Sequence, residues 1–322
     1  MSCSTQFDAI VCIPTFRRAE HLRKTLASLI AQTGNIRFAV VVVDNDIERR
    51  EGKAVAEEIF ATGTLNGICV VEEEQGNCHA INRAFSTARS MFDQVEFFLM
   101  IDDDEVASES WLAEMIASAR NSGADLVGGP VRRIFETTPS RGLNAHTIFN
   151  NGYVRSGFVP TLHGSGNVLI RRRVFDSLGE PSFDIQFNFL GGADMDFFTR
   201  SRRAGFVSYW NSSAEAFETV PSKRMSISWV LKRSIFIGVI NYKIDRKYHP
   251  GVRGLSWLII KNSLTLPLSV ARALVRSFET QHWLPATFPV CVSIGRNLAI
   301  FGFEPAPYKF HGASKAIEKL PL

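Results

Sequence analysis

The sequence predicts an α/β protein with a Rossmann-like, doubly wound parallel sheet flanked by helices. Three observations predict this fold class. Short apolar runs of strand length alternate with helical patterns through the first third of the chain. The run at residues 38–43 is uninterrupted, as expected of a parallel strand that is covered on both faces. Of the 322 residues, 45% are apolar, which is enough to bury a sizeable core.

The predicted elements follow one another in regular order up to about residue 130. Strands are predicted at residues 8–13, 38–43, 68–71, 96–101 and 124–127. Helices are predicted around residues 21–30, 53–60, 79–91 and 111–120. The alternation then becomes irregular. A loop-rich insert from residue 133 to about 166 precedes a strand at 167–170, a helix from near Arg172, and a helix that residues 191–196 open.

Polar side chains follow the predicted strands where they end. The strand ends are Pro14-Thr15-Phe16-Arg17, Asp44-Asn45-Asp46, residues 72–77 and Asp102-Asp103-Asp104-Glu105. In open α/β sheets, ligands bind beyond the carboxyl ends of the strands. Because these ends meet at one edge of a parallel sheet, three acidic strand ends are expected to converge there.

The row from Asp102 to Glu105 predicts a metal site. Consecutive carboxylates repel one another unless a cation lies between them, and all-oxygen ligands suit Mg²⁺ or Mn²⁺, which would bridge the phosphates of a substrate. The alternative is an acidic turn that caps a helix starting near Ser108. The position at the end of a parallel strand favours the metal.

The sequence lacks the glycine loops of dehydrogenases and kinases. No GxGxxG follows the first strand, and no GxxxxGK[ST] occurs anywhere. A nucleotide would therefore bind by its base and ribose at the acidic strand ends and by its diphosphate through a metal.

Charge is unevenly distributed along the chain. The net charge is +4, but the segment from Arg200 to Arg276 contains fourteen Lys and Arg residues and only three Asp and Glu residues. That half is expected to seek phosphate or anionic lipid. Nucleic acid is not expected, because the acidic strand ends would repel its backbone. The five cysteines show no CxxC spacing and are expected to be reduced, and the absence of a signal-like N-terminus predicts a cytoplasmic protein.

With these features the chain resembles a family 2 glycosyltransferase with the GT-A fold, which has a mixed Rossmann-like sheet flanked by helices. The matching stretches, in the family's order, are residues 11–18, 40–46, 102–104 and 191–198. The resemblance implies a GT-A catalytic domain at residues 1–245, with a nucleotide-binding half (1–130) and an acceptor-binding half (131–245). Residues 246–322 would form a helical C-terminal region.

The resemblance also implies an activity and a site. The chain would move a sugar, most simply a hexose, from a UDP-sugar to a lipid-linked or polysaccharide acceptor with inversion, and Asp194 would be the catalytic base. The implied metal ligands for Mn²⁺ or Mg²⁺ are Asp104 and Asp102. The implied nucleotide-binding residues are Pro14, Thr15, Arg17, Asp44, Asn82, Asp102, Asp103, Arg224 and Arg233. Lys223 is a further candidate for the diphosphate, and His163 for the acceptor.

Two departures from the family pattern motivate an alternative. Ala193 stands where the family commonly has Glu, with Asp196 as a candidate to compensate, and Ile81 stands in place of Arg. A non-catalytic scaffold or partner subunit with the GT-A fold would tolerate both. For Asp194 and Asp196 the structural alternative is helix capping, and for Asp44 it is a turn.

The C-terminal region has two apolar segments, residues 255–275 and 283–303. Charged residues and prolines interrupt both, so neither is an uninterrupted span of about 20 apolar residues. A basic, Trp-bearing amphipathic pair predicts helices in a membrane interface and a peripheral location on the inner face of the plasma membrane. The alternative is packing on the catalytic domain or a homodimer contact.

Overall fold

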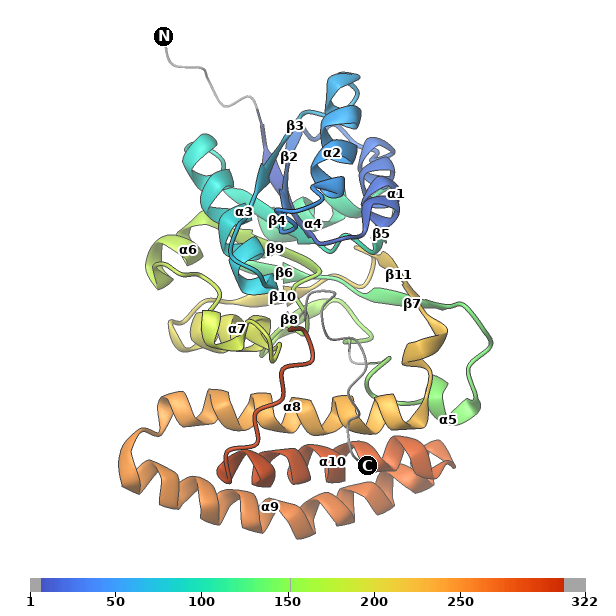
Figure 1. Ribbon diagram of the computed structural model, residues 1–322, viewed down its shortest axis with the longest axis vertical. Helices are drawn as coiled ribbons and strands as arrows, with labels where there is room; N and C mark the ends of the chain where they lie inside the picture. The colour runs from blue at the N-terminus through green and yellow to red at the C-terminus, as the bar shows by residue number, and fades with distance from the viewer. Residues whose placement is uncertain (1–6, 151, 310–322) are drawn as a thin grey trace.

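The computed structural model describes residues 7–150 and 152–309. Its centre is an eight-stranded mixed sheet in the order β3-β2-β1-β4-β9-β6-β10-β8 (Figure 1). These strands are β1 (Ala9–Thr15), β2 (Phe38–Asp44), β3 (Gly67–Val71), β4 (Phe97–Ile101), β6 (Leu126–Gly128), β8 (Gly157–Val159), β9 (Asn167–Arg171) and β10 (Ser208–Trp210). A smaller sheet contains β5 (Glu105–Ala107), β11 (Ala216–Val220) and β7 (Val131–Phe135), in that order.

Strand direction divides the large sheet into two parts. β1, β2, β3 and β4 pair in parallel, whereas β9 runs antiparallel between β4 and β6. The predicted strands and helices of the first part are confirmed to within a few residues. The predicted strand at residues 167–170 is β9, and its direction makes the sheet mixed, as the GT-A resemblance implies.

Helices cover both faces of the sheet, because side chains along each strand alternate between two apolar cores. Ala9, Val11 and Ile13 pack into one core, and Ile10 and Cys12 into the other. The first core is covered by α1 (Ala19–Ile30), α2 (Glu51–Ala61) and α4 (Trp111–Ser122), and the second by α3 (Asn77–Met91), α6 (Arg172–Leu178) and α7 (Ala193–Arg203). The loop-rich insert contributes β7, β8 and the short α5 (Arg141–Asn144).

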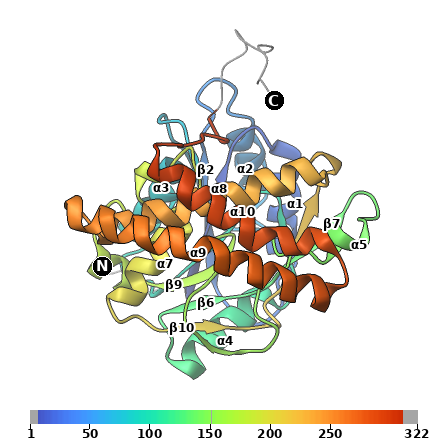
Figure 2. The same ribbon diagram turned by 90° about the horizontal axis from the view of Figure 1, so that it is seen from below.

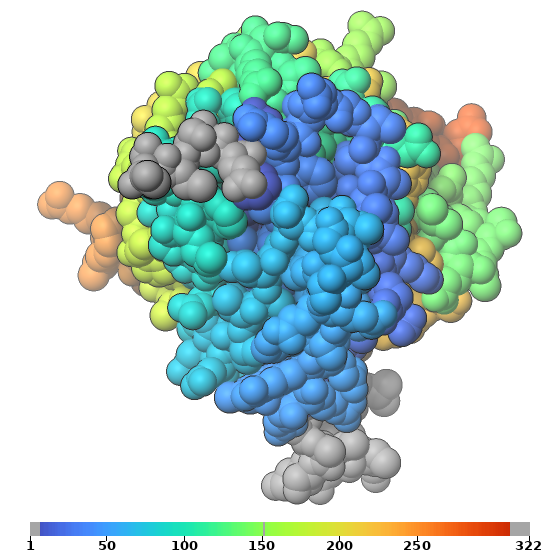
Figure 3. Space-filling model, turned by 90° about the horizontal axis from the view of Figure 1, so that it is seen from above, coloured from blue at the N-terminus to red at the C-terminus, as the bar shows by residue number. Residues whose placement is uncertain are grey.

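Three long helices, which we call the helical layer, lie below the sheet domain (Figures 1 and 2). They are α8 (Ile227–Tyr248), α9 (Gly251–Thr280) and α10 (Trp283–Ile300). One side of α8 joins the second core through Val239, Ile240 and Ile244, and the other side packs against α10. Seen from the opposite side, the N-terminal strands and helices fill the centre of the view, and the helical layer emerges only at the margin (Figure 3).

Two details of the helical layer were not predicted from the sequence. Residue 245, the predicted domain boundary, lies inside the continuous α8. α9 continues through Lys261, Asn262 and Pro267, and α10 continues through Pro289, because a proline removes one backbone hydrogen bond without ending a helix that neighbours support.

Four of the five cysteines lie in the described residues and are free thiols, as expected: Cys12, Cys69, Cys78 and Cys291. Burial raises the pKa of each of these thiols. They are therefore protonated, unreactive packing residues. Cys3, and residues 310–322 of the predicted C-terminal region, lie outside the described residues.

Candidate active site

Three strand ends meet at one edge of the large sheet. β1 pairs with β2, with Thr15 opposite Asp44, and with β4 on its other side. The turn after β4 therefore lies beside the end of β1. We call this turn, Asp102 to Glu105, the acidic edge. The three predicted acidic strand ends follow β2, β3 and β4, which run parallel in the order β3-β2-β1-β4, so all three lie at this edge of the sheet, as predicted.

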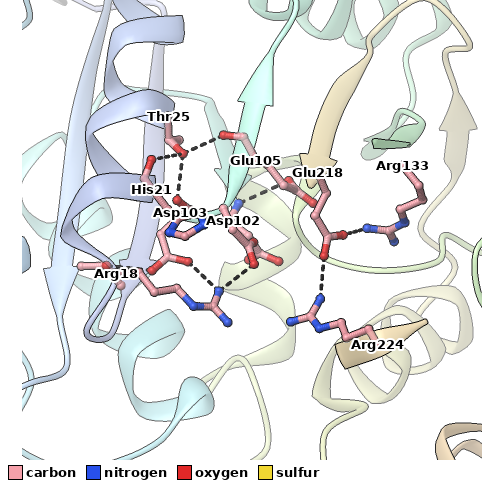
Figure 4. Close-up of polar contacts among 11 residues, drawn as sticks. Arg18, His21, Thr25, Asp102, Asp103, Glu105, Arg133, Glu218 and Arg224 are labelled. Carbon is pink, nitrogen blue, oxygen red and sulfur yellow. Dashed lines mark hydrogen bonds and ion pairs between the residues drawn. The ribbon is translucent and has the colours of Figure 1, made fainter. Parts of the chain in front are cut away.

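Hydroxyls and one guanidinium hold the acidic edge against the start of α1 (Figure 4). Thr15 Oγ1 donates to Asp103 Oδ2 at 2.8 Å. Arg18 Nη1 donates to Asp103 Oδ1 at 3.0 Å and to Asp104 Oδ2 at 2.7 Å. Thr25 Oγ1, on α1, donates to the backbone carbonyl of Asp103 at 3.0 Å. Asp103 is 5% exposed, so its carboxylate is a fixed part of the edge.

The acidic edge carries more negative charge than its surroundings balance. Burial, reinforced by Asp104 and Asp103, raises the pKa of Asp102 to about 7. Burial also raises the pKa of Asp103, against the opposing effect of Arg18. The pKa of Glu105 lies well above its ordinary value because the residue is buried near Asp102. A cation at this edge would favour the ionised forms.

The residues present fit a divalent ion that is shared with a substrate. All donors at the edge are carboxylate oxygens, which suit Mg²⁺ and Mn²⁺. Within residues 7–150 and 152–309, no group of three or more His, Cys, Asp and Glu side chains is arranged to hold a metal alone. One or two carboxylates completed by phosphate oxygens is the arrangement that Mg²⁺ commonly adopts with nucleotides.

A row of charged side chains crosses the small sheet beside the edge (Figure 4). Glu218 on β11 is in register with Glu105 on β5 and with Arg133 on β7. Arg133 forms an ion pair with Glu218, and Arg224 Nη1 lies 2.7 Å from Glu218 Oε1. Burial lowers the pKa of Arg133, while Glu105 acts to raise it. The predicted Arg224 is thus held near the edge by Glu218.

Three residues of this site were not predicted: Arg18, Arg133 and Glu218. Arg18 follows Thr15 closely, so the sequence contained a signal for it. Arg133 and Glu218 are 85 positions apart in the chain. They meet through strand register, for which the sequence offered no signal.

Asp194 lies in the first turn of α7 and is within electrostatic reach of the acidic edge. Gly192, with φ 87°, precedes the helix, and a Cβ there would lie 2.3 Å from Ile240 Cγ2. Burial raises the pKa of Asp194, opposed by a backbone N–H and by Arg233. The Asp194 charge in turn helps to raise the pKa of Asp102. The structure therefore brings together Asp194, Arg233 and the edge, which lie far apart in the sequence.

His163 belongs to the same neighbourhood. Burial lowers the pKa of His163, and the Asp194 charge opposes that shift. The Tyr153 ring stacks on its imidazole with centroids 5.5 Å apart. His163 therefore lies on the loop-rich insert, near Asp194, and stacks on Tyr153.

Asp196 does not replace the carboxylate that Ala193 lacks. It is 0% exposed, and its oxygens accept from Arg200 Nε at 2.9 Å and from Lys247 Nζ at 2.7 Å. Since Lys247 comes from α8, this ion pair fastens α7 to the helical layer. The idea that Asp196 compensates at the site is wrong, because both of its oxygens are engaged in that junction.

Both carboxylate oxygens of Asp44 accept hydrogen bonds from nearby backbone N–H groups. Asp44 Oδ1 accepts from the N–H of Asp46 at 3.0 Å, and Oδ2 accepts from the N–H of Lys53 at 2.8 Å. The side chain is 0% exposed, and a Cβ on Gly52 would lie 3.0 Å from Oδ2. The structure thus gives Asp44 the turn role that the sequence left as the alternative. Pro14 is buried in β1.

Two further predicted residues have local partners. Asn82 pairs with the backbone of Phe183, donating to its carbonyl at 2.8 Å and accepting from its N–H at 2.7 Å. Arg17 donates to Asp46 at 2.7 Å and to Glu48 at 2.8 Å. These contacts fix Asn82 to the loop before α7 and Arg17 to the loop after β2.

Comparison with known proteins places this geometry in a family. A family model described as "Glycosyl transferase family 2" matches residues 10–179. The succinoglycan biosynthesis protein ExoM of Rhizobium meliloti is 30% identical over an alignment of 257 residues, and the match covers 76% of this chain and 77% of that protein.

Solved structures share the fold across almost the whole chain. The mannosyltransferase PcManGT of Pyrobaculum calidifontis, in complex with GDP-Man and Mn²⁺, aligns with a TM-score of 0.59 and 16% identity, over 92% of this chain and 88% of that one. TarS 1-349 of S. aureus, in complex with UDP, aligns with a TM-score of 0.53 and 14% identity, over 92% of both chains. The likeness includes the helical layer, because 92% coverage cannot be reached without it.

Proposed function

We propose, from the premise that the chain belongs to glycosyl transferase family 2, that it transfers a hexose from a UDP-sugar with inversion of the anomeric centre. The observation that carries the proposal is the neighbourhood of Asp194 and the acidic edge. In a single displacement, the acceptor oxygen bonds to the same sugar carbon from which the nucleotide diphosphate departs. The base and the diphosphate site must therefore lie close to that carbon.

Asp194 is proposed as the base. It takes the proton of the acceptor hydroxyl as that oxygen bonds to the sugar carbon and the bond from this carbon to the diphosphate breaks. The raised pKa of Asp194 supports this role, because a base is most effective when its pKa approaches the working pH.

The acidic edge and the arginines are proposed to hold the donor. Asp104 and Asp102 would hold Mn²⁺ or Mg²⁺, which when bound supplies positive charge to the departing diphosphate. Asp103, tied to Thr15, positions the nucleoside, and Arg224 and Arg233 offer guanidinium groups to the phosphates. UDP is proposed as the nucleotide, although the solved structures with this fold include complexes with both UDP and GDP-Man.

The proposed acceptor is a growing polysaccharide or a lipid-linked saccharide at the inner face of the plasma membrane. ExoM, which is 30% identical, is named for succinoglycan biosynthesis, and this supports a polysaccharide product. The residues that line the acceptor side come from the insert with His163 and from the start of α7.

A scaffold without catalysis is the second candidate, and one observation favours it. Ala193 removes a carboxylate that the family commonly has, and Asp196 is committed to Arg200 and Lys247. A scaffold need bind neither UDP nor Mn²⁺, so calorimetric titration with both separates the two candidates.

Turnover of nucleotide sugars tests the proposal. The purified chain is incubated with a panel of UDP- and GDP-hexoses and an extracted glycolipid acceptor, with Mn²⁺ or with EDTA, and the linkage is read by NMR. We expect a UDP-hexose to be used, EDTA to abolish transfer, added Mn²⁺ to restore it, and the product to have the opposite anomeric configuration. Retention of configuration, or full activity in EDTA, would contradict the mechanism.

A further inference from the structure

In α9, the outer helix of the helical layer, polar residues are buried and apolar residues are exposed. The buried residues of α9 are Leu258, Asn262 and Ser269, two of which are polar. Its exposed face is instead apolar and extends along the helix. The large exposed residues are Val252, Trp257, Ile259, Ile260, Leu264, Leu266, Leu268, Val270, Leu274, Val275 and Phe278. A surface helix of a water-exposed protein shows the opposite arrangement.

Polar groups and close backbone contacts fill the inside of the layer. Asp245 on α8 accepts from Lys261 of α9 at 2.8 Å and from Arg296 of α10 at 2.6 Å. A Cβ on Gly238 would lie 2.1 Å from the Val292 carbonyl, so α8 and α10 meet backbone to backbone. Small-residue contacts and polar groups between helices are typical of helices whose outer face meets lipid.

The exposed face also has charges and aromatic rings suited to a membrane surface. Arg253 and Arg272 are exposed on α9, and Glu279 is its one exposed acid. Trp257 is 46% exposed, and Trp283, at the start of α10, is 55% exposed. Tryptophan favours the headgroup level, and cations attract anionic lipids.

We propose that α9 lies flat in the interface of an anionic lipid bilayer, with its apolar face at the boundary between headgroups and acyl chains. By length and composition, α9 is the one helix in residues 7–150 and 152–309 that could cross a membrane. Crossing conflicts with its attachments. Both ends of α9 lead into helices, α8 and α10, that pack against each other, so a span would have to separate them.

Binding of α9 to a membrane does not depend on the proposed function. Only its consequence, that the acceptor reaches the site from the membrane side, rests on the proposed function. The surface itself is tested by flotation of the full chain with vesicles. We expect binding to phosphatidylglycerol–phosphatidylcholine vesicles and about tenfold weaker binding to vesicles of phosphatidylcholine alone. High salt should weaken the binding to the anionic vesicles, because it screens their attraction for the cations of α9.

Matched substitutions locate the surface. The double change Leu264→Glu and Leu268→Glu alters side chains that are 62% and 54% exposed, so the fold is retained, and we expect flotation to be lost. Val154→Glu, at a residue on the sheet domain that is 90% exposed, is the control and should float like the wild type. Unchanged flotation of the double variant would overturn the proposal.

Two measurements exclude the other occupants of this face. Trp257 fluorescence should be quenched by lipids with bromine near the headgroup more than by lipids brominated at the bilayer centre, and the reverse order would mean a span. Light scattering should give the same mass for the wild type and the double variant, whereas a wild-type dimer that the variant abolishes would mean that a second copy covers α9.

Turnover with a soluble acceptor should persist in the double variant. A wild-type protein that turns over sugar nucleotide but does not float with anionic vesicles would overturn only this inference. A wild-type protein that floats but shows no turnover would overturn only the proposed function.

Discussion

The acidic edge and the helical layer both contain buried charged groups, but they use them differently. At the edge, Asp102 and Glu105 are crowded by other carboxylates, and Arg18 offsets only part of that charge. In the layer, Asp245 is matched by two cations, and burial is outweighed so that its pKa is lowered. Excess charge of one sign at a strand edge suits the binding of a cation, whereas balanced charge between helices stabilises their packing.

The same contrast occurs within two residues of α7. Asp194 is within reach of the edge and lacks a cation at ion-pair distance among the described residues, whereas Asp196 is bound by Arg200 and Lys247. Position in the motif cannot distinguish the two acids. Their partners can, and substitutions should separate a chemical role from a structural one.

The largest expected effect is that of Asp194→Asn. Loss of the base should lower transfer by about 10² to 10⁴-fold, since the amide cannot accept the hydroxyl proton. UDP affinity, measured by calorimetry, should stay within about threefold, and the unfolding midpoint should not fall. If the variant keeps most of its transfer rate, Asp194 is not the base and the contrast with Asp196 fails.

Asp196→Ala should act on stability instead. Two cations would lose a fully buried partner, at a cost of about 3 kcal/mol in the free energy of unfolding. Urea denaturation measures it. The control is Asp176→Ala, which removes a 3.9 Å pair with Arg89 at a residue that is 55% exposed and should cost less than about 0.5 kcal/mol. A loss of transfer in folded Asp196→Ala protein, with unchanged stability, would reverse the two assignments.

The sequence predicted the acidic edge because its signal is local. An apolar strand followed by carboxylates, as at residues 97–105, reveals both the element and the end at which ligands bind. The polarity of α9 was harder to predict. Lys261, Asn262 and Pro267 look like interruptions in a one-dimensional apolar run, but on a helix Lys261 and Asn262 face the partner helices and leave the outer face apolar.

Contacts between remote segments could not be predicted. Arg133 and Glu218 meet because β7 and β11 are parallel neighbours in a sheet that no periodicity reveals. Asn82 was expected to bind nucleotide from its position in the family pattern, and Asp44 from that pattern and from its place at a strand end. Whether a neighbouring backbone already uses such a side chain depends on the loops after α6 and β2, and these were irregular in the sequence.

Arg18 offers a smaller test of the charge excess at the edge. Its guanidinium now stands beside Asp103 and Asp104, so a metal has to compete with its charge. Arg18→Gln should therefore bind Mn²⁺ about tenfold more tightly in the absence of nucleotide, as measured by calorimetry. Arg23→Gln is the control, because Arg23 pairs with Glu58 on the outside of the protein. Weaker Mn²⁺ binding in Arg18→Gln would mean that Arg18 builds the site and does not oppose the metal.

The smallest effect is expected at His146, where the insert meets the helical layer. His146 is 0% exposed, its Nδ1 accepts from the N–H of Ile148, and its Nε2 has no hydrogen-bond partner within the described residues. Burial, with a smaller contribution from Arg276, lowers the pKa of His146 to about 4. The folded protein thus binds fewer protons than the unfolded chain between pH 4 and the ordinary histidine pKa of about 6.5.

Stability should consequently fall as the pH falls through that window. Between pH 6.5 and 5.5 the loss from His146 is about 1 kcal/mol, and above pH 6.5 it vanishes. His146→Gln should remove this part of the pH dependence in urea titrations, compared with the wild type over the same pH range. If His146→Gln leaves the slope unchanged, protonation of this junction does not contribute to it.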